Sequence, residues 1–469
     1  MIVDRHTPID LFALLPKLRL EMDPELAQLD VFLEDDELFA RVKADLCQRF
    51  PNSATLGRRS TPVEVILRML VVKRLYDFSY EDTERFVSDS ITLRQFCRLY
   101  LEPAPDDTTL IRWANVIGPD TLEGLNARVV ELARSLKVTR GRKLRTDGTV
   151  VETGIHHPTD SGLLADGVRV LGRLTRKAKA AVSESVRSAT PGERFRDRSR
   201  SANRLKQKVD RLARRLRSDA TRSVQREAYA KLLRVARASM EQGEQLIELL
   251  GEVAEGGEQK TTAIREDMER FSSLLARVVS QTERRVFGAD SVPSAEKLVS
   301  IFEPHTDIIC RGKSGKPTEF GKKVWLSEVD GGIVSSYRIL DGNPSDNEQI
   351  EPELEHHLRL FGAPPKLLAA DRGCYSPENE RFAEELGVEM ICLPKRGSKT
   401  EERRKHEKQR WFKRGQRFRA GSEGRISVLK RRGHLGTCRD HAKEGFERWV
   451  GWGILSGNLS TIARSLASS

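Results

Sequence analysis

The chain has 469 residues, with 81 Lys and Arg against 69 Asp and Glu, a formal charge of +12 and a sequence pI of about 9.4. This length excludes one small fold and predicts several packed units. The basic surplus favours a polyanionic partner. The sequence shows no uninterrupted apolar run of transmembrane length and no N-terminal signal-peptide pattern. We therefore expect a soluble, cytoplasmic protein without membrane contact.

The positive charge is concentrated in two segments. Residues 171–240 contain 21 Lys and Arg against 6 Asp and Glu, and residues 395–432 contain 16 against 4, so the remainder of the chain is net acidic. Each segment could follow a phosphate backbone. A solvated helix face explains one such run about equally well. Two runs that flank candidate catalytic carboxylates favour nucleic-acid binding.

The six cysteines are scattered along the chain without a Cys-x2-Cys pair. They are Cys47, Cys97, Cys310, Cys374, Cys392 and Cys438. This spacing predicts neither a zinc ribbon nor a disulfide framework, and it fits a reducing compartment.

Residues 1–140 are predicted to form short helices. One helix is expected to begin at Thr61-Pro62-Val63-Glu64, with Thr61 as the N-cap. A second is expected to begin at Ser79, with Phe86 and Val87 facing inward, and a third at Asp106 or Asp107. Such helices could form a helix-turn-helix module that binds DNA, although most small helical clusters are structural. The groove-facing candidates are Thr108, Thr109, Arg112 and Asn115.

A strand is predicted around Asp147, where β-branched residues alternate after Lys143. A long, basic helical segment follows from about Asp160 to Gln281. Its apolar residues recur at helical spacing and predict an amphipathic or coiled helical hairpin that turns or ends near the glycines of residues 241–258. This stripe packs within its own chain or mediates dimerisation. Its members are Leu205, Val209, Leu212, Leu216, Val224, Leu232 and Val235.

Strands return after this helical segment. Strands are predicted at residues 298–302, 308–310, 324–329, 333–340, 366–370 and 388–393, with helices at residues 351–361 and 376–386. The alternation of strands and helices predicts an α/β domain that is interrupted by the helical insertion.

Two aspartates occupy strand positions in this predicted domain. Asp147 lies in the first strand and Asp371 directly follows a later apolar strand, where ligands collect in open α/β sheets. Taken singly, either residue could simply belong to a turn. Glu423 has Arg419 four residues before it and Lys430 seven after it, so a continuous helix would place all three within roughly 40°. Gly421 and Gly424 argue against that helix, and we expect it to begin near Ser422.

These motifs resemble insertion-sequence transposases with a ribonuclease-H-like catalytic domain. Their signature is Tyr-x2-Arg-x3-Glu-x6-Lys, and Arg419, Glu423 and Lys430 match its last three positions, whereas Gln416 stands at the tyrosine position. Residues 144–151 look like the first catalytic strand of the family, and residues 370–376 look like its second motif. The position of the helical insertion, between the first two catalytic strands, resembles that in the ISNCY-like group, whereas the insertion's own sequence matches no family named here.

The resemblance implies an α/β fold with a ribonuclease-H-like mixed sheet flanked by helices. The expected parts are a helical DNA-binding region at residues 1–140, a catalytic domain at 141–159 and 296–469, and a basic helical insertion at 160–295. Asp147, Asp371 and Glu423 would be the catalytic metal ligands for two Mg²⁺ ions, with Mn²⁺ as a substitute. The expected DNA-binding residues are Arg419, Lys430, Arg112, Arg211, Arg214, Arg215, Lys395 and Arg396.

The implied activity is cleavage of DNA at the ends of a mobile element and transfer of the 3′-hydroxyl strand into target DNA. The partners would be double-stranded terminal repeats and target DNA, bound by a homodimer. Two alternatives stay open: a transposase-derived DNA-binding protein without catalysis, and a ribonuclease-H-like nuclease that does not join strands. Glu444 and Glu447 are the alternative third carboxylates.

Overall fold

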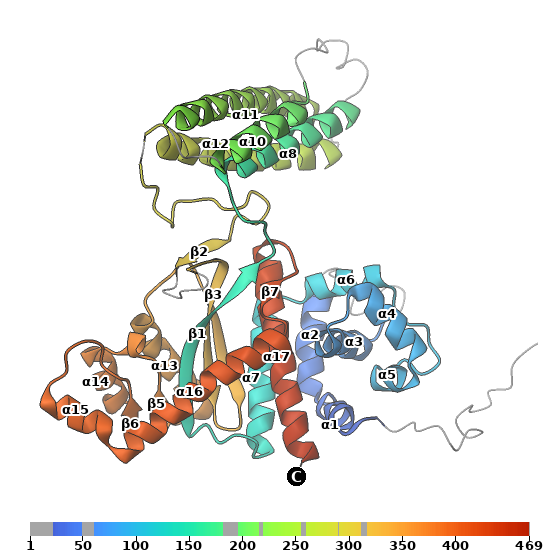
Figure 1. Ribbon diagram of the computed structural model, residues 1–469. Coiled ribbons are helices and arrows are strands. Elements are labelled where there is room, and N and C mark those ends of the chain that lie inside the picture. The colour runs from blue at the N-terminus through green and yellow to red at the C-terminus, as the bar shows by residue number, and fades with distance from the viewer. Residues whose placement is uncertain are drawn as a thin grey trace, which may run out of the picture. The chain divides into compact units, whose positions relative to one another are not determined.

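The computed structural model describes residues 22–48, 61–181, 196–214, 219–254, 259–288, 290–310 and 317–468. The fold is mixed α/β and divides into two compact units, Met1–Glu152 with Lys322–Ser469, and Thr153–Gly321 (Figure 1). Within the described ranges, no helix combines the length and the apolar character needed to cross a membrane.

Short helices precede the sheet of the first unit. They are α1 (Pro24–Phe32), α2 (Asp36–Gln48), α3 (Val63–Tyr76), α4 (Tyr80–Asp89), α5 (Ile91–Phe96), α6 (Asp107–Val116) and α7 (Pro119–Ser135). Ser79 and Asp106 cap α4 and α6 through side-chain hydrogen bonds, which confirms both predicted starts. The N-cap of α3 is Pro62 rather than Thr61, and its side chain makes no capping bond.

The inward face of α4 was only partly predicted. Val87 is fully buried, but Phe86 is 39% exposed and stacks on Phe78 at the surface. The buried stripe runs through Thr83 and Val87, which are one helical turn apart, so their neighbour Phe86 points away from the core. The prediction that Phe86 faces inward is therefore wrong.

The second unit contains a helical bundle rather than a simple hairpin. Its described helices, α8 (Asp160–Ala181), α10 (Ser199–Ala213), α11 (Asp219–Ala254) and α12 (Gln259–Val286), pack side by side (Figure 1). The predicted apolar stripe lies mainly inside this bundle, since Val209 and Leu232 are buried, whereas Val224 is 40% exposed. Leu216 lies outside the described residues. The helix α11 passes through Gly251 and ends at Ala254, within the segment where a turn was predicted.

The predicted strand at residues 298–302 is absent, and the described backbone there is irregular. Leu298 and Ile301 insert into the apolar core of the bundle. The side chain of Gln281 donates to the Leu298 carbonyl at 3.1 Å and accepts from the Leu298 amide at 2.9 Å. The backbone groups that a sheet would need are therefore bonded to a helix side chain instead.

The sheet of the first unit has the strand order β4-β3-β1-β5-β6, and β7 also pairs with β1. The strands are β1 (Lys143–Thr153), β3 (Thr318–Val329), β4 (Ile333–Leu340), β5 (Leu367–Ala369), β6 (Met390–Cys392) and β7 (Thr437–Cys438). In the second unit, β2 (Asp307–Cys310) pairs antiparallel with the first residues of β3. β1, β5 and β6 run parallel, while β3 and β4 form an antiparallel hairpin, with positive φ at Gly331 and Gly332.

Helices cover both faces of this sheet. They are η1 (Asn347–Gln349), α13 (Ile350–Phe361), η2 (Arg372–Cys374), α14 (Pro377–Glu385), α15 (Glu401–Lys408), α16 (Arg410–Arg431) and α17 (Ala442–Ala467). Leu367 and Ala369 of β5 pack against Phe412 of α16, whereas Leu368 packs in the cluster that contains α13 and α14. Because side chains alternate along a strand, odd-numbered positions of β5 face α16. Trp449 and Trp452 of α17 are buried core residues.

The helix α16 is continuous from Arg410 to Arg431, so the predicted start near Ser422 is wrong. A glycine costs a helix only about 0.5–1 kcal/mol, which close packing can offset. A Cβ atom at Gly421 would lie 2.2 Å from an Arg145 nitrogen, and one at Gly415 would lie 2.1 Å from the Cys392 sulfur. Glycine at these positions lets α16 approach the sheet closely.

Candidate active site

The two predicted aspartates lie level with each other on neighbouring parallel strands. The last paired residues of β1 and β5 are Arg145 and Ala369, and Asp147 and Asp371 each follow two residues later. Both positions therefore share the sheet face that α16 covers. The side chain of Asp147 is 19% exposed and that of Asp371 is 44% exposed, so the pair borders solvent.

The Arg419 guanidinium gathers all three predicted carboxylates. It lies 3.2 Å from Asp147 and 3.8 Å from Asp371, both measured from the same nitrogen, and 3.5 Å from Glu423 through a second nitrogen. Arg419 and Glu423 are one turn apart on α16, as the predicted 40° spacing requires. Glu423 itself is 74% exposed. The structure thus brings these residues together around one cation.

The electrostatics of Asp147 reflect its partial burial. Burial raises the pKa of this carboxyl, and the nearby Asp371 charge raises it further. Arg419, the Ser422 hydroxyl and the Gly148 amide act in the opposite direction, because they stabilise the ionised form. Ser422 donates to Asp147 at 3.0 Å. A cation beside Asp147 therefore offsets a real desolvation cost.

Arg419 is itself incompletely satisfied. Its Nε atom is buried and has no hydrogen-bond partner among the described residues. A buried, unpaired donor on a charged group is unfavourable, so the guanidinium is held by the acids on one side only. This position suits a side chain that can exchange its partners.

Arg145 is a positioning residue that the sequence analysis missed. It donates two hydrogen bonds to Glu328 of β3, at 2.8 and 2.6 Å, and one to the Phe418 carbonyl of α16 at 2.5 Å. Both charged side chains are largely buried. This pair fixes α16 over β1 and β3, and so places Arg419 above the aspartates. Its partners are distant in sequence, and no local motif marks them.

Gln416 occupies the position of the signature tyrosine and has a structural contact. Its side-chain amide donates to the Cys392 carbonyl at the end of β6, at 2.9 Å. Lys430 lies on the same helix as Glu423 and is half-buried. Gln416 therefore attaches α16 to the sheet on one side of the carboxylates.

The remaining predicted DNA-binding residues lie on other surfaces. Arg112 is exposed on α6 and donates to Thr108. Arg211 and Arg214 are exposed at the C-terminal end of α10, whereas Arg215 lies outside the described residues. In the loop before α15, Arg396 is exposed and the Lys395 amide donates to Glu407. None of these residues adjoins the carboxylates through a contact in the described part of the chain.

The alternative third carboxylates lie elsewhere in the unit. Glu444 pairs with Arg448, and Glu447 pairs with Lys443. Burial raises the pKa of Glu447, and the nearby charges of Asp341 and Asp120 raise it further. Within the described residues, no three His, Cys, Asp or Glu side chains are close enough to hold one metal ion. The carboxylates around Arg419 are thus gathered by an arginine and do not form a ready-made metal cage.

Comparison with known proteins supports a mobile-element origin. A family model described as "Transposase domain (DUF772)" matches residues 16–115, the region of α1 to α6. An uncharacterized protein, ORF8 of the nfe locus of Rhizobium meliloti, is 31% identical over 129 residues, which are 26% of this chain and 62% of that protein. No solved structure matches the chain. The family match supports a transposase family for this chain.

Proposed function

We propose that the chain is a metal-dependent DNA transposase of the Asp-Asp-Glu type, with Asp147, Asp371 and Glu423 as its catalytic carboxylates. The observation that carries the proposal is their convergence on Arg419 from β1, from the end of β5 and from α16. The sheet order β4-β3-β1-β5-β6 agrees with the ribonuclease-H-like arrangement expected for such enzymes. The match to a transposase-domain family supports the reaction class.

The carboxylates suit divalent metal by their chemistry. Mg²⁺ and Mn²⁺ prefer oxygen ligands, and a cationic group already lies among these oxygens. Bound metal would lower the pKa of an attacking water and stabilise the departing 3′ oxygen. Asp147, held by Ser422, would be the fixed ligand because it is the least exposed of the three. Glu423, on the exposed helix face, would complete the set.

Arg419 would then act on DNA. A guanidinium cannot remain among three acids that are neutralised by metal, since its charge would be repelled. Withdrawn from them, it presents a planar fork that matches a phosphate group. Its Nε is buried and unpaired among the described residues, so moving the side chain away from the acids would also remove this unfavourable burial. The same side chain would thus compensate the acids before metal binds and contact the substrate backbone afterwards.

DNA contact outside the carboxylates would come from exposed cations. Arg112 on α6, Arg211 and Arg214 on α10, and Arg396 before α15 are accessible to a phosphate backbone. Pairing of two element ends would require a dimer. The apolar stripe of the bundle is mostly used within its own unit, so a dimer contact would use other surfaces.

The two alternatives predict different behaviour. A transposase-derived binding protein would bind element ends without cutting them. A ribonuclease-H-like nuclease would cut without joining strands. The pairing of Arg419 with all three acids favours an active site over a binding protein, because a binding protein does not need this ion cluster.

Cleavage and joining of the element's own ends, with Mg²⁺ or Mn²⁺, test the proposal. Asp147→Asn, Asp371→Asn and Glu423→Gln should each reduce cleavage by about 10³-fold or more while DNA binding persists, because each removes one anionic ligand. Glu444→Gln is the matched control and should cleave normally. Near-normal cleavage by any of the three variants would exclude that residue as a ligand, and cleavage without joining would indicate a nuclease.

A further inference from the structure

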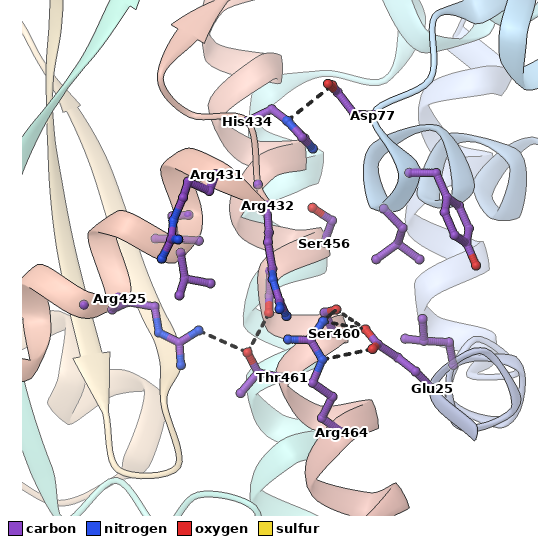
Figure 2. Close-up of a pocket in the computed structure, with 18 of the residues that line it drawn as sticks. Glu25, Asp77, Arg425, Arg431, Arg432, His434, Ser456, Ser460, Thr461 and Arg464 are labelled. Carbon is purple, nitrogen blue, oxygen red and sulfur yellow. Dashed lines mark hydrogen bonds and ion pairs between the residues drawn. The ribbon is translucent and has the colours of Figure 1, made fainter. Parts of the chain in front are cut away.

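A large cavity lies on the side of α16 that faces away from the carboxylates. Its volume is about 950 Å³, and it is bounded by α16, α17, α1 and the end of α3 (Figure 2). Val428 lines it and lies nine residues after Arg419, so the two point about 180° apart on the helix. One helix therefore has a carboxylate-facing side and a cavity-facing side.

The cavity is lined by more cations than anions. The cations are Arg145, Arg425, Arg431, Arg432 and Arg464, and the carboxylates are Asp23, Glu25 and Asp77. His434 also lines the cavity, and burial lowers the pKa of its imidazole. Internal pairs use most of these charges.

Arg464 pairs with Glu25 at 2.9 Å, His434 lies 3.3 Å from Asp77, and Arg425 contacts Glu328 and Thr461. Two positive charges remain outside these pairs. One of them, that of Arg432, acts on Glu25: burial raises the pKa of this carboxyl, whereas the charges of Arg464 and Arg432 lower it.

Those two charges belong to Arg431 and Arg432. Both are exposed, and neither has an ion-pair partner in the part of the chain that the structure describes. Arg431 donates only a long bond, 3.4 Å, to the Ser427 carbonyl of its own helix. Figure 2 shows Arg432 extending toward the cluster of Glu25, Ser460 and Arg464. An arginine without an ion-pair partner can bind a phosphate group through two parallel hydrogen bonds.

The opposite wall of the cavity combines apolar and aromatic side chains with carboxylates. Its apolar and aromatic members are Leu26, Leu29, Leu75 and Tyr76, and its carboxylates are Asp23, Glu25 and Asp77. Tyr76 is 44% exposed, and its ring stacks on that of Phe78 with the ring centroids 5.5 Å apart. An inorganic phosphate ion would make no stacking contact with this aromatic ring. A nucleotide would, because it joins an anionic phosphate to a base that stacks on aromatic rings.

We propose that this cavity binds a single strand of nucleic acid, with phosphodiester groups on Arg431 and Arg432 and a base against Tyr76. A volume of this size takes a ligand of small-molecule dimensions, which fits one or two unpaired nucleotides rather than a duplex. The inference rests on the proposed function for the source of the strand, an unpaired segment of the DNA being processed. The bound strand contacts the helix whose other side carries Arg419 and Glu423.

Fluorescence anisotropy with a labelled oligothymidylate of about twenty nucleotides tests the cavity on the full chain. Arg431→Ala/Arg432→Ala should weaken binding about tenfold or more and lower its salt dependence, because two phosphate groups would no longer have an arginine partner. Tyr76→Ala should weaken binding about fivefold or more, because the base would have no ring to stack on. The matched control is Arg359→Ala/Arg381→Ala, which removes two exposed arginines of α13 and α14 and should stay within about twofold of wild type.

Other outcomes would overturn the inference. Unchanged strand binding by the Arg431 and Arg432 variant excludes the cavity. Equal losses for a duplex probe indicate a general phosphate surface. Full competition by inorganic phosphate together with normal binding by Tyr76→Ala indicates a simple anion site. Thermal unfolding of each variant confirms that the fold is retained.

Cleavage assays on the same preparations separate this inference from the proposed function. Cleavage that depends on Asp371, together with unchanged strand binding by the Arg431 and Arg432 variant, removes the cavity and retains the catalytic proposal. If the Arg431 and Arg432 variant loses strand binding but cleavage does not depend on Asp371, the cavity inference is retained and the catalytic proposal is removed. No strand binding by the wild-type chain overturns the cavity inference directly.

Discussion

In the first unit the charges that hold α16 over the sheet are buried and paired between distant segments, whereas in the second unit several cations of α10 face solvent without an ion pair among the described residues. Arg145 and Glu328 are 183 residues apart in sequence and form a nearly buried ion pair. On α10, by contrast, an exposed row of cations has no ion pair among the described residues: Arg200, Arg204, Lys208 and Arg211. Net charge alone does not distinguish these uses. Burial and pairing show that the first set builds a site and the second is available to a polyanion.

The largest expected effect on stability tests the buried side of this comparison. Arg145→Met should destabilise the first unit by about 3 kcal/mol, because Glu328 would lose its main partner while remaining buried. Denaturant unfolding followed by tryptophan fluorescence suits this test, since all five tryptophans belong to the first unit. Arg85→Met removes the exposed partner of Asp82 and should change stability by less than about 1 kcal/mol. Equal effects for the two variants would contradict the comparison.

The exposed side is tested by the salt dependence of DNA binding. Replacing Arg204, Lys208 and Arg211 by alanine should weaken duplex binding and reduce the slope of log K against log salt by about 0.9 for each phosphate that the variant no longer neutralises. The control removes three bundle cations that already have acidic partners, Arg169, Lys231 and Arg237. If the control variant loses as much affinity as the α10 variant, unpaired charge is not what recruits DNA.

The smallest effect concerns two glycines of α16. Gly424→Ala should stabilise the chain by about 0.5–1 kcal/mol, because alanine favours a helix and the structure leaves open space there. Gly421→Ala should instead destabilise it, since the new methyl group would displace Arg145 from its pairs. Thermal unfolding of the two variants gives the signs. Stabilisation by Gly421→Ala would show that close packing of α16 is unimportant.

The sequence predicted features that depend on neighbouring residues. The starts of α4 and α6 follow from Ser79 and Asp106, which act on amides three residues away. The strand positions of Asp147 and Asp371 follow from the local residue pattern, whereas the parallel pairing that sets them level was not predicted. The contacts that stabilise these elements were not predictable. The Gln281 side chain bonds the Leu298 backbone in place of a neighbouring strand. The Arg145 side chain leaves no room for a Cβ atom at Gly421. Both contacts join segments that are distant in sequence, so no local pattern could reveal them.

Binding of Mn²⁺ to the full chain, measured by electron paramagnetic resonance, tests the central claim most directly. The claim is that Asp147, Asp371 and Glu423 form one metal site that Arg419 occupies before the metal arrives. Asp371→Asn should reduce Mn²⁺ affinity by about tenfold or more, and Arg419→Ala should increase it, because no internal cation then needs to be displaced. Mn²⁺ affinity that is unchanged by Asp371→Asn, or reduced by Arg419→Ala in a folded protein, would contradict this account.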